Sequence, residues 1–231
     1  MINRILVLLT AAAILGCSTT LPTALSGASG EEAQFAFSWD SEPVRAVVPE
    51  DYTNVLNLLD GDKPMLALYR EDLTHQAVTE FFLELTGSPA ITMPILYHAE
   101  RADMPLSLVF SIAWVESRYS PVAVNVNRNA TSVDRGLFQL NSRTFTDLTE
   151  EDFFNPDVNT YHGIEYLSWC MEHTETDIQA LTCYNAGLSR VRSGYTPPTT
   201  VVYIDRATRF RASLERRFRS YMLSRFPTDM T

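Results

Sequence analysis

Apolar residues recur at helical spacing almost without interruption from about residue 70 to the C-terminal end of the chain. Near the start of this region, Phe81, Phe82 and Leu85 follow Val78 at the i+3, i+4 and i+7 positions of an amphipathic helix. The last such segment begins at about Thr199 and continues the same spacing over several turns. The sequence therefore predicts an all-α fold.

Capping residues and prolines set the expected ends of these helices. The expected N-caps and first-turn residues are Thr74, Ser88-Pro89, Pro105, Asn155-Pro156 and either Thr176 or Asp177. Gly87 is the expected stop of the helix that starts at Thr74. Pro94 requires a kink or a later helix start, because a proline inside a helix removes a hydrogen bond. Only residues 35–39 and 44–48 show a brief strand-like alternation.

Charge is distributed unevenly along the 231 residues, whose net charge is −10. Residues 1–187 carry nine basic and twenty-five acidic side chains, a net −16, whereas residues 188–231 carry nine arginines and three acidic side chains, a net +6. The acidic body argues against a nucleic acid partner, because it would repel phosphate. The C-terminal arginines have two interpretations, a solvated helix face or a contact with anionic wall polymer or lipid headgroups.

The first seventeen residues have the pattern of a targeting segment. Arg4 precedes an apolar run from Ile5 to Leu15 that is too short to span a bilayer. The run ends in Ile14-Leu15-Gly16-Cys17, which resembles the lipobox of bacterial lipoproteins, and this implies lipid attachment to Cys17 and a membrane partner. A plain secretory signal is the alternative. Ser18 after the cysteine implies, by resemblance to enteric sorting rules, an outer-membrane location facing the periplasm.

Cys170 and Cys183 are the two remaining cysteines, with twelve residues between them. In an oxidising compartment the pair is able to form a disulfide. Two buried thiols on facing helices are the alternative. The residue pattern leaves both open.

Glu116 is the candidate for chemistry that the helical pattern itself identifies. It extends the apolar stripe of Leu108 and Ile112 at spacings of four, at the C-terminal end of its predicted helix. Desolvation and the helix dipole both disfavour the charged carboxylate, so we expect a pKa about one to two units above its usual value of about 4.3. A raised pKa suits a general acid near neutral pH.

Four motifs follow one another in the sequence around and after Glu116. They are Trp114-Val115-Glu116-Ser117, Gly136-Leu137-Phe138-Gln139, Tyr184-Asn185-Ala186-Gly187 and the Tyr of Thr200-Val201-Val202-Tyr203. In order and spacing they resemble the motifs of soluble-type lytic transglycosylases, over roughly residues 90–225. The resemblance implies a lysozyme-like fold related to goose-type lysozymes, and peptidoglycan as the substrate.

The resemblance also implies site residues. Glu116 matches the catalytic Glu, and Gln139 matches a Gln that hydrogen-bonds the sugar. Tyr184 matches a Tyr whose hydroxyl lies near the catalytic carboxylate, and Asn185 matches a position that shapes the helix end facing the cleft. Ser117 and Phe138 complete the expected substrate-binding set, with Phe138 standing where many members have Met. The alternative is that Tyr184 and Asn185 only cap a helix.

In the implied reaction Glu116 protonates the bond between N-acetylmuramic acid and N-acetylglucosamine. The ionised residue then takes the proton of the 6-hydroxyl group, which closes a 1,6-anhydro ring without water.

Asp134 lies in a stretch between Glu116 and Gln139 that is longer than the commonest form. The longer form resembles a branch that includes transglycosylases of secretion systems, which implies cell-envelope machinery as a partner. Asp134 also stands where a goose-type hydrolase keeps a second carboxylate, so a muramidase that uses Glu116, Asp134 and water is the rival function. A local turn hydrogen bond is the other interpretation of Asp134. A wall-binding lipoprotein that does not cut glycan is the rival from another class.

No cofactor or metal is expected, because the four histidines and the cysteines lack metal-ligand spacing. Ser117 has no partnered histidine motif, which argues against a hydrolytic triad. We expect four parts: a lipoprotein signal peptide at 1–17, a tether at 18–45, an acidic, partly helical extension at 46–88, and the catalytic domain at 89–226.

Overall fold

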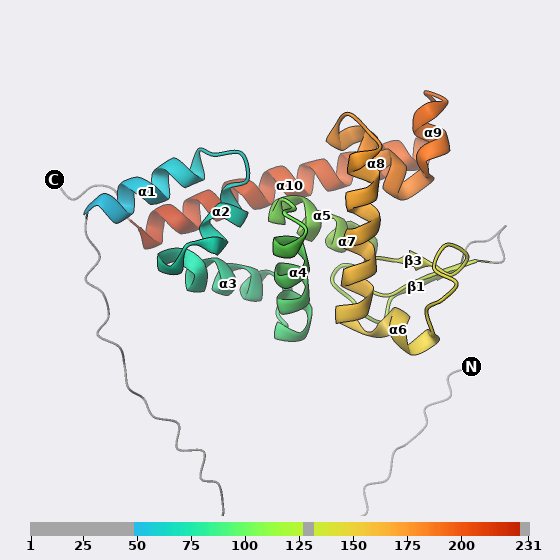
Figure 1. Ribbon diagram of the computed structural model, residues 1–231, viewed down its shortest axis with the longest axis horizontal. Helices are drawn as coiled ribbons and strands as arrows, with labels where there is room; N and C mark the ends of the chain where they lie inside the picture. Colours follow the sequence, from blue (N-terminus) through green and yellow to red (C-terminus); the bar gives the residue numbers. More distant parts are fainter. Residues whose placement is uncertain (1–48, 127–131, 227–231) are drawn as a thin grey trace, which may run out of the picture. The chain divides into compact units, whose positions relative to one another are not determined.

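The computed structural model describes residues 49–126 and 132–226, which fold mainly into helices (Figure 1). Ten helices lie in this part of the chain: α1 (Pro49–Leu59), α2 (Pro64–Arg70), α3 (Asp72–Thr86), α4 (Pro89–Arg101), α5 (Leu106–Ser117), α6 (Glu150–Phe154), α7 (Pro156–Glu172), α8 (Asp177–Ala186), α9 (Leu188–Arg192) and α10 (Pro198–Arg225). The predicted all-α fold is confirmed. No helix of the described ranges is long and apolar enough to cross a membrane.

Several predicted helix ends are confirmed by their backbone geometry. Gly87 ends α3 in the left-handed conformation, with a φ of 70°. The Asn155 side chain caps the start of α7, and the Thr176 side chain caps α8 by accepting from the Gln179 amide. The prediction for Thr74 is wrong: α3 begins at Asp72, and the Thr74 hydroxyl donates to the Leu68 carbonyl instead.

A small antiparallel sheet was not predicted. It consists of β1 (Val124–Val126), β2 (Val133–Arg135) and β3 (Leu140–Asn141), in the order β1-β2-β3. Strands of two or three residues are too short to show a period-two pattern in sequence. The two segments with strand-like alternation, residues 35–39 and 44–48, lie outside the described residues.

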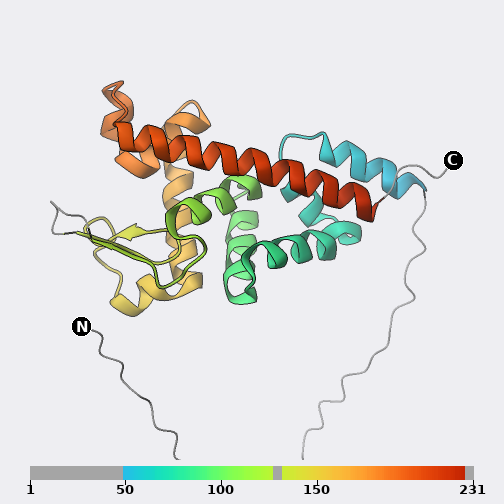
Figure 2. The ribbon, with the colours of Figure 1, turned by 180° about the vertical axis from the view of Figure 1, so that it is seen from behind.

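Helix α5 runs through the middle of the hydrophobic core. All its residues from Leu106 to Ala113 are buried. On one side it packs along the long helix α10, as Figure 2 shows from behind. On another side Phe110 of α5 stacks on Phe82 of α3, with ring centroids 4.0 Å apart. Helices α1 to α3 therefore contribute to the same core as the helix that carries Glu116.

The C-terminal arginines lie mostly on an exposed face of α10, in line with the solvated-face interpretation, and four of them make ion pairs. Arg219 pairs with Asp60 at 2.8 Å, and Arg225 pairs with Glu80 at 2.6 Å. The other two paired arginines are Arg209, with Asp205, and Arg211, with Asp177 and Glu215. Single exposed pairs contribute little to stability. The pairs of Arg219 and Arg225 match the basic end of α10 to acidic residues of the N-terminal region.

Gly163 in α7 allows the Phe138 ring to lie directly against the helix. A Cβ atom at Gly163 would lie 2.5 to 2.8 Å from atoms of the Phe138 side chain, closer than carbon atoms approach. The Phe138 ring is itself 1% exposed, so it has no free space to move into. This packing fixes the segment that leads into Gln139.

We therefore predict that Gly163→Ala destabilises the protein by about 1–3 kcal/mol, the usual cost of overpacking a filled core. The free energy of unfolding in urea measures the effect. Glu165→Ala, at an exposed position of the same helix, is the matched control and should stay within about 0.5 kcal/mol of the wild type. Equal stability of the two variants would contradict the packing argument.

Candidate active site

Three of the four sequence motifs and strands of the small sheet meet around a cavity of about 350 Å³. Glu116 reaches it from the last turn of α5, Asp134 from β2, and Tyr184 from the end of α8. The other lining residues are Phe138, Gln139, Leu140, Asn141, Thr144, Phe145, Tyr166, Asn185 and Gly187. The cavity is therefore the candidate active site.

Glu116 lies one residue before the end of α5, where Arg118 adopts the left-handed conformation and turns the chain. The carboxyl group is partly buried at the edge of the core. Burial, and secondarily the negative charge of Asp134, raise the pKa of Glu116 to about 8, although Tyr203 lowers it in part. The direction agrees with the expectation from sequence, and the value is higher. At neutral pH Glu116 is therefore mostly protonated.

Two tyrosine hydroxyls lie near this carboxyl group. Burial, and the nearby charge of Glu116, raise the pKa of both Tyr184 and Tyr203, so both remain neutral donors. The Tyr184 hydroxyl donates to the Phe138 carbonyl at 3.1 Å. The Tyr203 hydroxyl is buried and makes no hydrogen bond of good geometry within the described residues. It is thus a hydrogen-bond donor positioned beside Glu116.

Tyr203 was not predicted as a site residue. The sequence offered a signal, because this tyrosine ends one of the four motifs. Its position in the apolar stripe of α10 made a core role equally consistent with the pattern. Only the packing of α10 along α5 shows that its hydroxyl reaches Glu116.

Asp134 lies on strand β2 and lines the cavity, which corrects its interpretation as a turn residue. It is paired across the sheet with Asn141 of β3, whose side-chain amide donates to the Asp134 carboxylate at 2.6 Å. Asn125 of β1 donates to its other oxygen at 3.4 Å. Side chains from both neighbouring strands therefore hold the carboxylate in place.

Gln139 has a defined orientation in the cavity. Its backbone is left-handed, with a φ of 48°. Its side-chain nitrogen donates to the carbonyls of Ala123 at 3.1 Å and Gly136 at 2.9 Å. Because both partners are carbonyls, the nitrogen must face them, and the side-chain oxygen is left to accept from a ligand. A ligand N–H or O–H group fits this position.

Of the predicted residues Ser117 and Asn185, only Asn185 lines the cavity. Ser117 does not line the cavity, because its hydroxyl donates to the Ala113 carbonyl inside α5. Asn185 lines the cavity, but its side-chain oxygen accepts from the buried Thr200 hydroxyl at 2.8 Å. That bond joins the end of α8 to the start of α10.

Five further lining residues were missed: Leu140, Asn141, Thr144, Phe145 and Tyr166. The segment from Leu140 to Phe145 directly follows the Gln139 motif, and its proximity to that motif was the available signal. Tyr166 lies on α7, in no motif, and only the tertiary fold brings it to the cavity.

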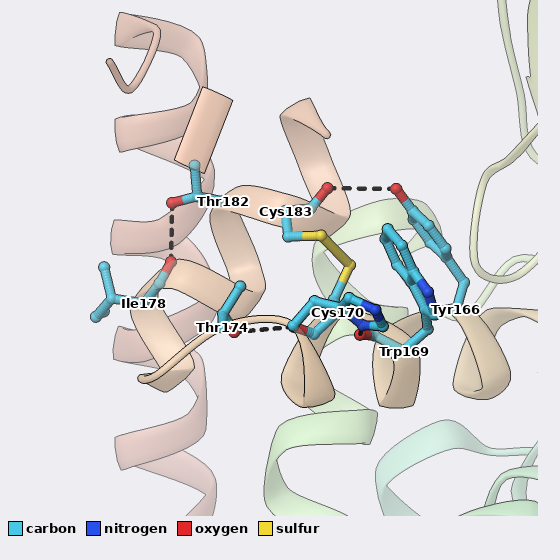
Figure 3. Close-up of a disulfide and its surroundings, with 8 residues drawn as sticks. Tyr166, Trp169, Cys170, Thr174, Ile178, Thr182 and Cys183 are labelled. Atoms are coloured by element: carbon cyan, nitrogen blue, oxygen red, sulfur yellow. Dashed lines mark hydrogen bonds between the residues drawn. A yellow bond between two sulfur atoms is a disulfide. The ribbon is translucent and has the colours of Figure 1, made fainter. Parts of the chain in front are cut away.

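Cys170 and Cys183 form a disulfide that joins α7 to α8, with their Cα atoms 5.7 Å apart (Figure 3). The Tyr166 hydroxyl donates to the Cys183 carbonyl across the same two helices. Tyr184 follows the bridge directly in sequence. The bridge thus holds together the two helices that supply Tyr166 and Tyr184 to the cavity.

No group of metal-ligating side chains occurs within residues 49–126 and 132–226. Residues 93–196 match the family described as the transglycosylase SLT domain. The match contains Glu116 and every residue that lines the cavity, whereas Tyr203 lies beyond it. The searches of curated proteins and of solved structures gave no significant match.

The raised pKa of Glu116 has a consequence for stability that Glu116→Gln reveals. The folded-state pKa of about 8 exceeds the ordinary value of 4.5. The carboxyl group therefore contributes its full stability below pH 4.5, and this contribution is lost as pH rises through about 8. Glu116→Gln removes this loss. The Tm of the variant should therefore rise relative to that of the wild type between pH 5 and pH 8, and equal or exceed it at the upper end of this range.

Thermal unfolding monitored by circular dichroism at several pH values measures this difference. Glu165→Gln, which removes an exposed carboxylate, is the control and should show no such trend. A clear loss of stability in Glu116→Gln at pH 7 to 8 would mean that hydrogen bonds, rather than desolvation, dominate at this carboxyl group.

Proposed function

Because the chain contains a transglycosylase SLT domain, we propose that it cleaves peptidoglycan glycan strands without water, leaving 1,6-anhydro-N-acetylmuramic acid ends. The domain gives the chain a peptidoglycan-cleaving function of the lytic transglycosylase type at the level of the family. The observation that carries the finer proposal is the Glu116 carboxyl group, partly buried in a polar cavity, whose raised pKa keeps it mostly protonated at neutral pH.

In the first step Glu116 acts as the general acid. It transfers its proton to the oxygen between N-acetylmuramic acid and N-acetylglucosamine, and the bond from that oxygen to C1 of the muramic acid breaks. The positive charge that develops at C1 is stabilised by the acetamido group of the same sugar. The side-chain oxygen of Gln139 supports this geometry by accepting from a substrate N–H or O–H group.

In the second step the ionised Glu116 acts as the general base. It takes the proton of the 6-hydroxyl group, whose oxygen attacks C1 and closes the anhydro ring. Glu116 is then protonated again, and no water is consumed. Tyr203 supports this alternation, because its buried hydroxyl is able to donate to the carboxylate while the carboxylate is charged.

Asp134 favours a second candidate, a muramidase. Its carboxylate lines the same cavity as Glu116, and Asn141 and Asn125 hold it. A second carboxylate in such a position is able to orient a water molecule or to stabilise positive charge at C1. The products, with anhydro ends or reducing ends, separate the two candidates.

Mass analysis of the products from purified sacculi tests the proposal. We expect anhydro ends, which are lighter than reducing ends by one water molecule. Glu116→Gln should reduce cleavage by at least two orders of magnitude, because it removes the proton donor and keeps the side-chain shape. Reducing ends from the wild type, or activity of the variant above a few per cent, would contradict the assignment.

Asp134→Asn gives a second prediction, because it removes the negative charge that raises the pKa of Glu116. We expect anhydro products to persist with a modest loss of rate. The activity of the wild type should fall as pH rises through about 8, and in the variant this fall should begin at a lower pH. The pH profile of kcat/KM measures the shift. A collapse of activity as severe as in Glu116→Gln would instead support the muramidase.

We also propose that lipid on Cys17 anchors the enzyme to the outer membrane, facing the periplasm. Cys17 lies outside the described residues, and the support is the sequence from Ile14 to Ser18. Cys17→Ala should release the protein from the membrane fraction and abolish labelling by a palmitate analogue. An unlabelled wild-type protein would contradict the anchor.

A further inference from the structure

We propose that Trp169 forms a sugar-binding subsite that extends the cavity along α7 and contacts a ring of the glycan strand. This inference rests on the proposed function, since it names a second place where the same substrate is held. It assigns a ligand to a surface that lies outside the cavity lining.

Three aromatic side chains of α7 and its C-cap form a continuous row, which we call the α7 aromatic row: Tyr166, Trp169 and His173. They are spaced by three and four residues, so they lie on one face of the helix. The rings of Tyr166 and Trp169 are nearly parallel, at 11°, with centroids 5.9 Å apart. The rings of Trp169 and His173 have centroids 4.5 Å apart. Figure 3 shows Tyr166 and Trp169 side by side next to the disulfide.

The row begins at the cavity. Tyr166 lines the cavity together with Phe145, and the centroids of their two rings are 6.1 Å apart. From Tyr166 the row runs towards the C-terminal end of α7, over about 10 Å of helix. A polymer bound beside Glu116 and leaving the cavity past Tyr166 would therefore meet Trp169 next.

Trp169 is exposed to solvent, which rules out a role in the core. Its side chain is 39% exposed, whereas the opposite face of α7 buries Gly163, Leu167 and Cys170. The two faces of the indole pack against the Tyr166 and His173 rings, so its exposed edge is the part that meets a ligand. The apolar C–H groups of that edge are able to pack against the C–H groups of a pyranose ring. An exposed aromatic surface next to a polysaccharide cavity fits this ligand.

The row is held rigidly, which reduces the entropic cost of binding. The disulfide of Cys170, the residue after Trp169, fixes the helix to α8. The Tyr166 hydroxyl donates to the Cys183 carbonyl, and the His173 side chain hydrogen-bonds the Trp169 carbonyl at 2.8 Å. The rings are thus positioned before a sugar arrives.

The charges around the row favour a neutral sugar over an anionic partner. Glu172 and Glu175 are exposed at this end of α7 and in the turn that follows it. Carboxylates repel anionic lipid headgroups and phosphate-rich wall polymers. The uncharged N-acetylglucosamine rings of the glycan meet no such repulsion.

Binding of chitooligosaccharides to the full-length Glu116→Gln protein, measured by calorimetry, tests the inference without cleavage. Adding Trp169→Ala should weaken binding of the hexasaccharide about tenfold, the scale of one lost aromatic contact. Binding of the disaccharide, which is too short to occupy both the cavity and the row, should be unchanged. Trp169→Phe should restore most of the lost affinity.

Ile178→Ala is the matched control, because Ile178 is a 50% exposed apolar residue on the neighbouring helix α8. It should leave binding of both oligosaccharides unchanged. Trp169→Gln is a second variant, which keeps a long side chain. For every variant, a Tm equal to that of the Glu116→Gln parent verifies that the protein is folded.

Unchanged hexasaccharide binding in both Trp169→Ala and Trp169→Gln would overturn the inference. An equal loss of affinity for the disaccharide and the hexasaccharide would overturn it too. Neither result affects the proposed function, which is decided separately by the products that the wild type releases from sacculi. If the wild type releases none, the proposed function fails whatever Trp169 binds.

Discussion

The desolvation of one carboxyl group, Glu116, is the constraint on which the rest of the site depends. A buried carboxylate is costly, and the protein tolerates it because the group stays protonated at neutral pH. This state exists only because α5 is packed on several sides, by α10 along its length and by Phe82 against Phe110. The chemistry of the cavity is therefore a property of the whole core, and not of the cavity lining alone.

The groups around Glu116 divide into those that favour its neutral form and those that stabilise its charged form. Burial and Asp134 disfavour the carboxylate, whereas Tyr203 favours it. A residue that must both give and take a proton needs these influences in balance. The sheet is essential to this balance, since β3 supplies the Asn141 amide that holds Asp134.

The helical spacing predicted most helices, because amphipathic segments of ten or more residues carry a strong periodic signal. It also placed Glu116 on the apolar stripe, from which the direction of its pKa shift followed. The three short strands carry no such signal, and the sheet was missed. Tyr166 and Asn141 were missed for a related reason: each reaches the cavity through tertiary contacts that no local pattern records. Ser117 shows the reverse error, since a motif neighbour of Glu116 turns its hydroxyl back into the helix.

The shared core of the N-terminal helices has a consequence for modularity. The family match covers residues 93–196, yet Phe110 inside it packs on Phe82, which lies before it, and α5 packs along α10, which lies after it. A fragment cut at the limits of the match would expose these apolar faces to water. The SLT segment of this chain is therefore not a transplantable unit, and a chimera or minimal enzyme has to keep α1 to α3 and the whole of α10.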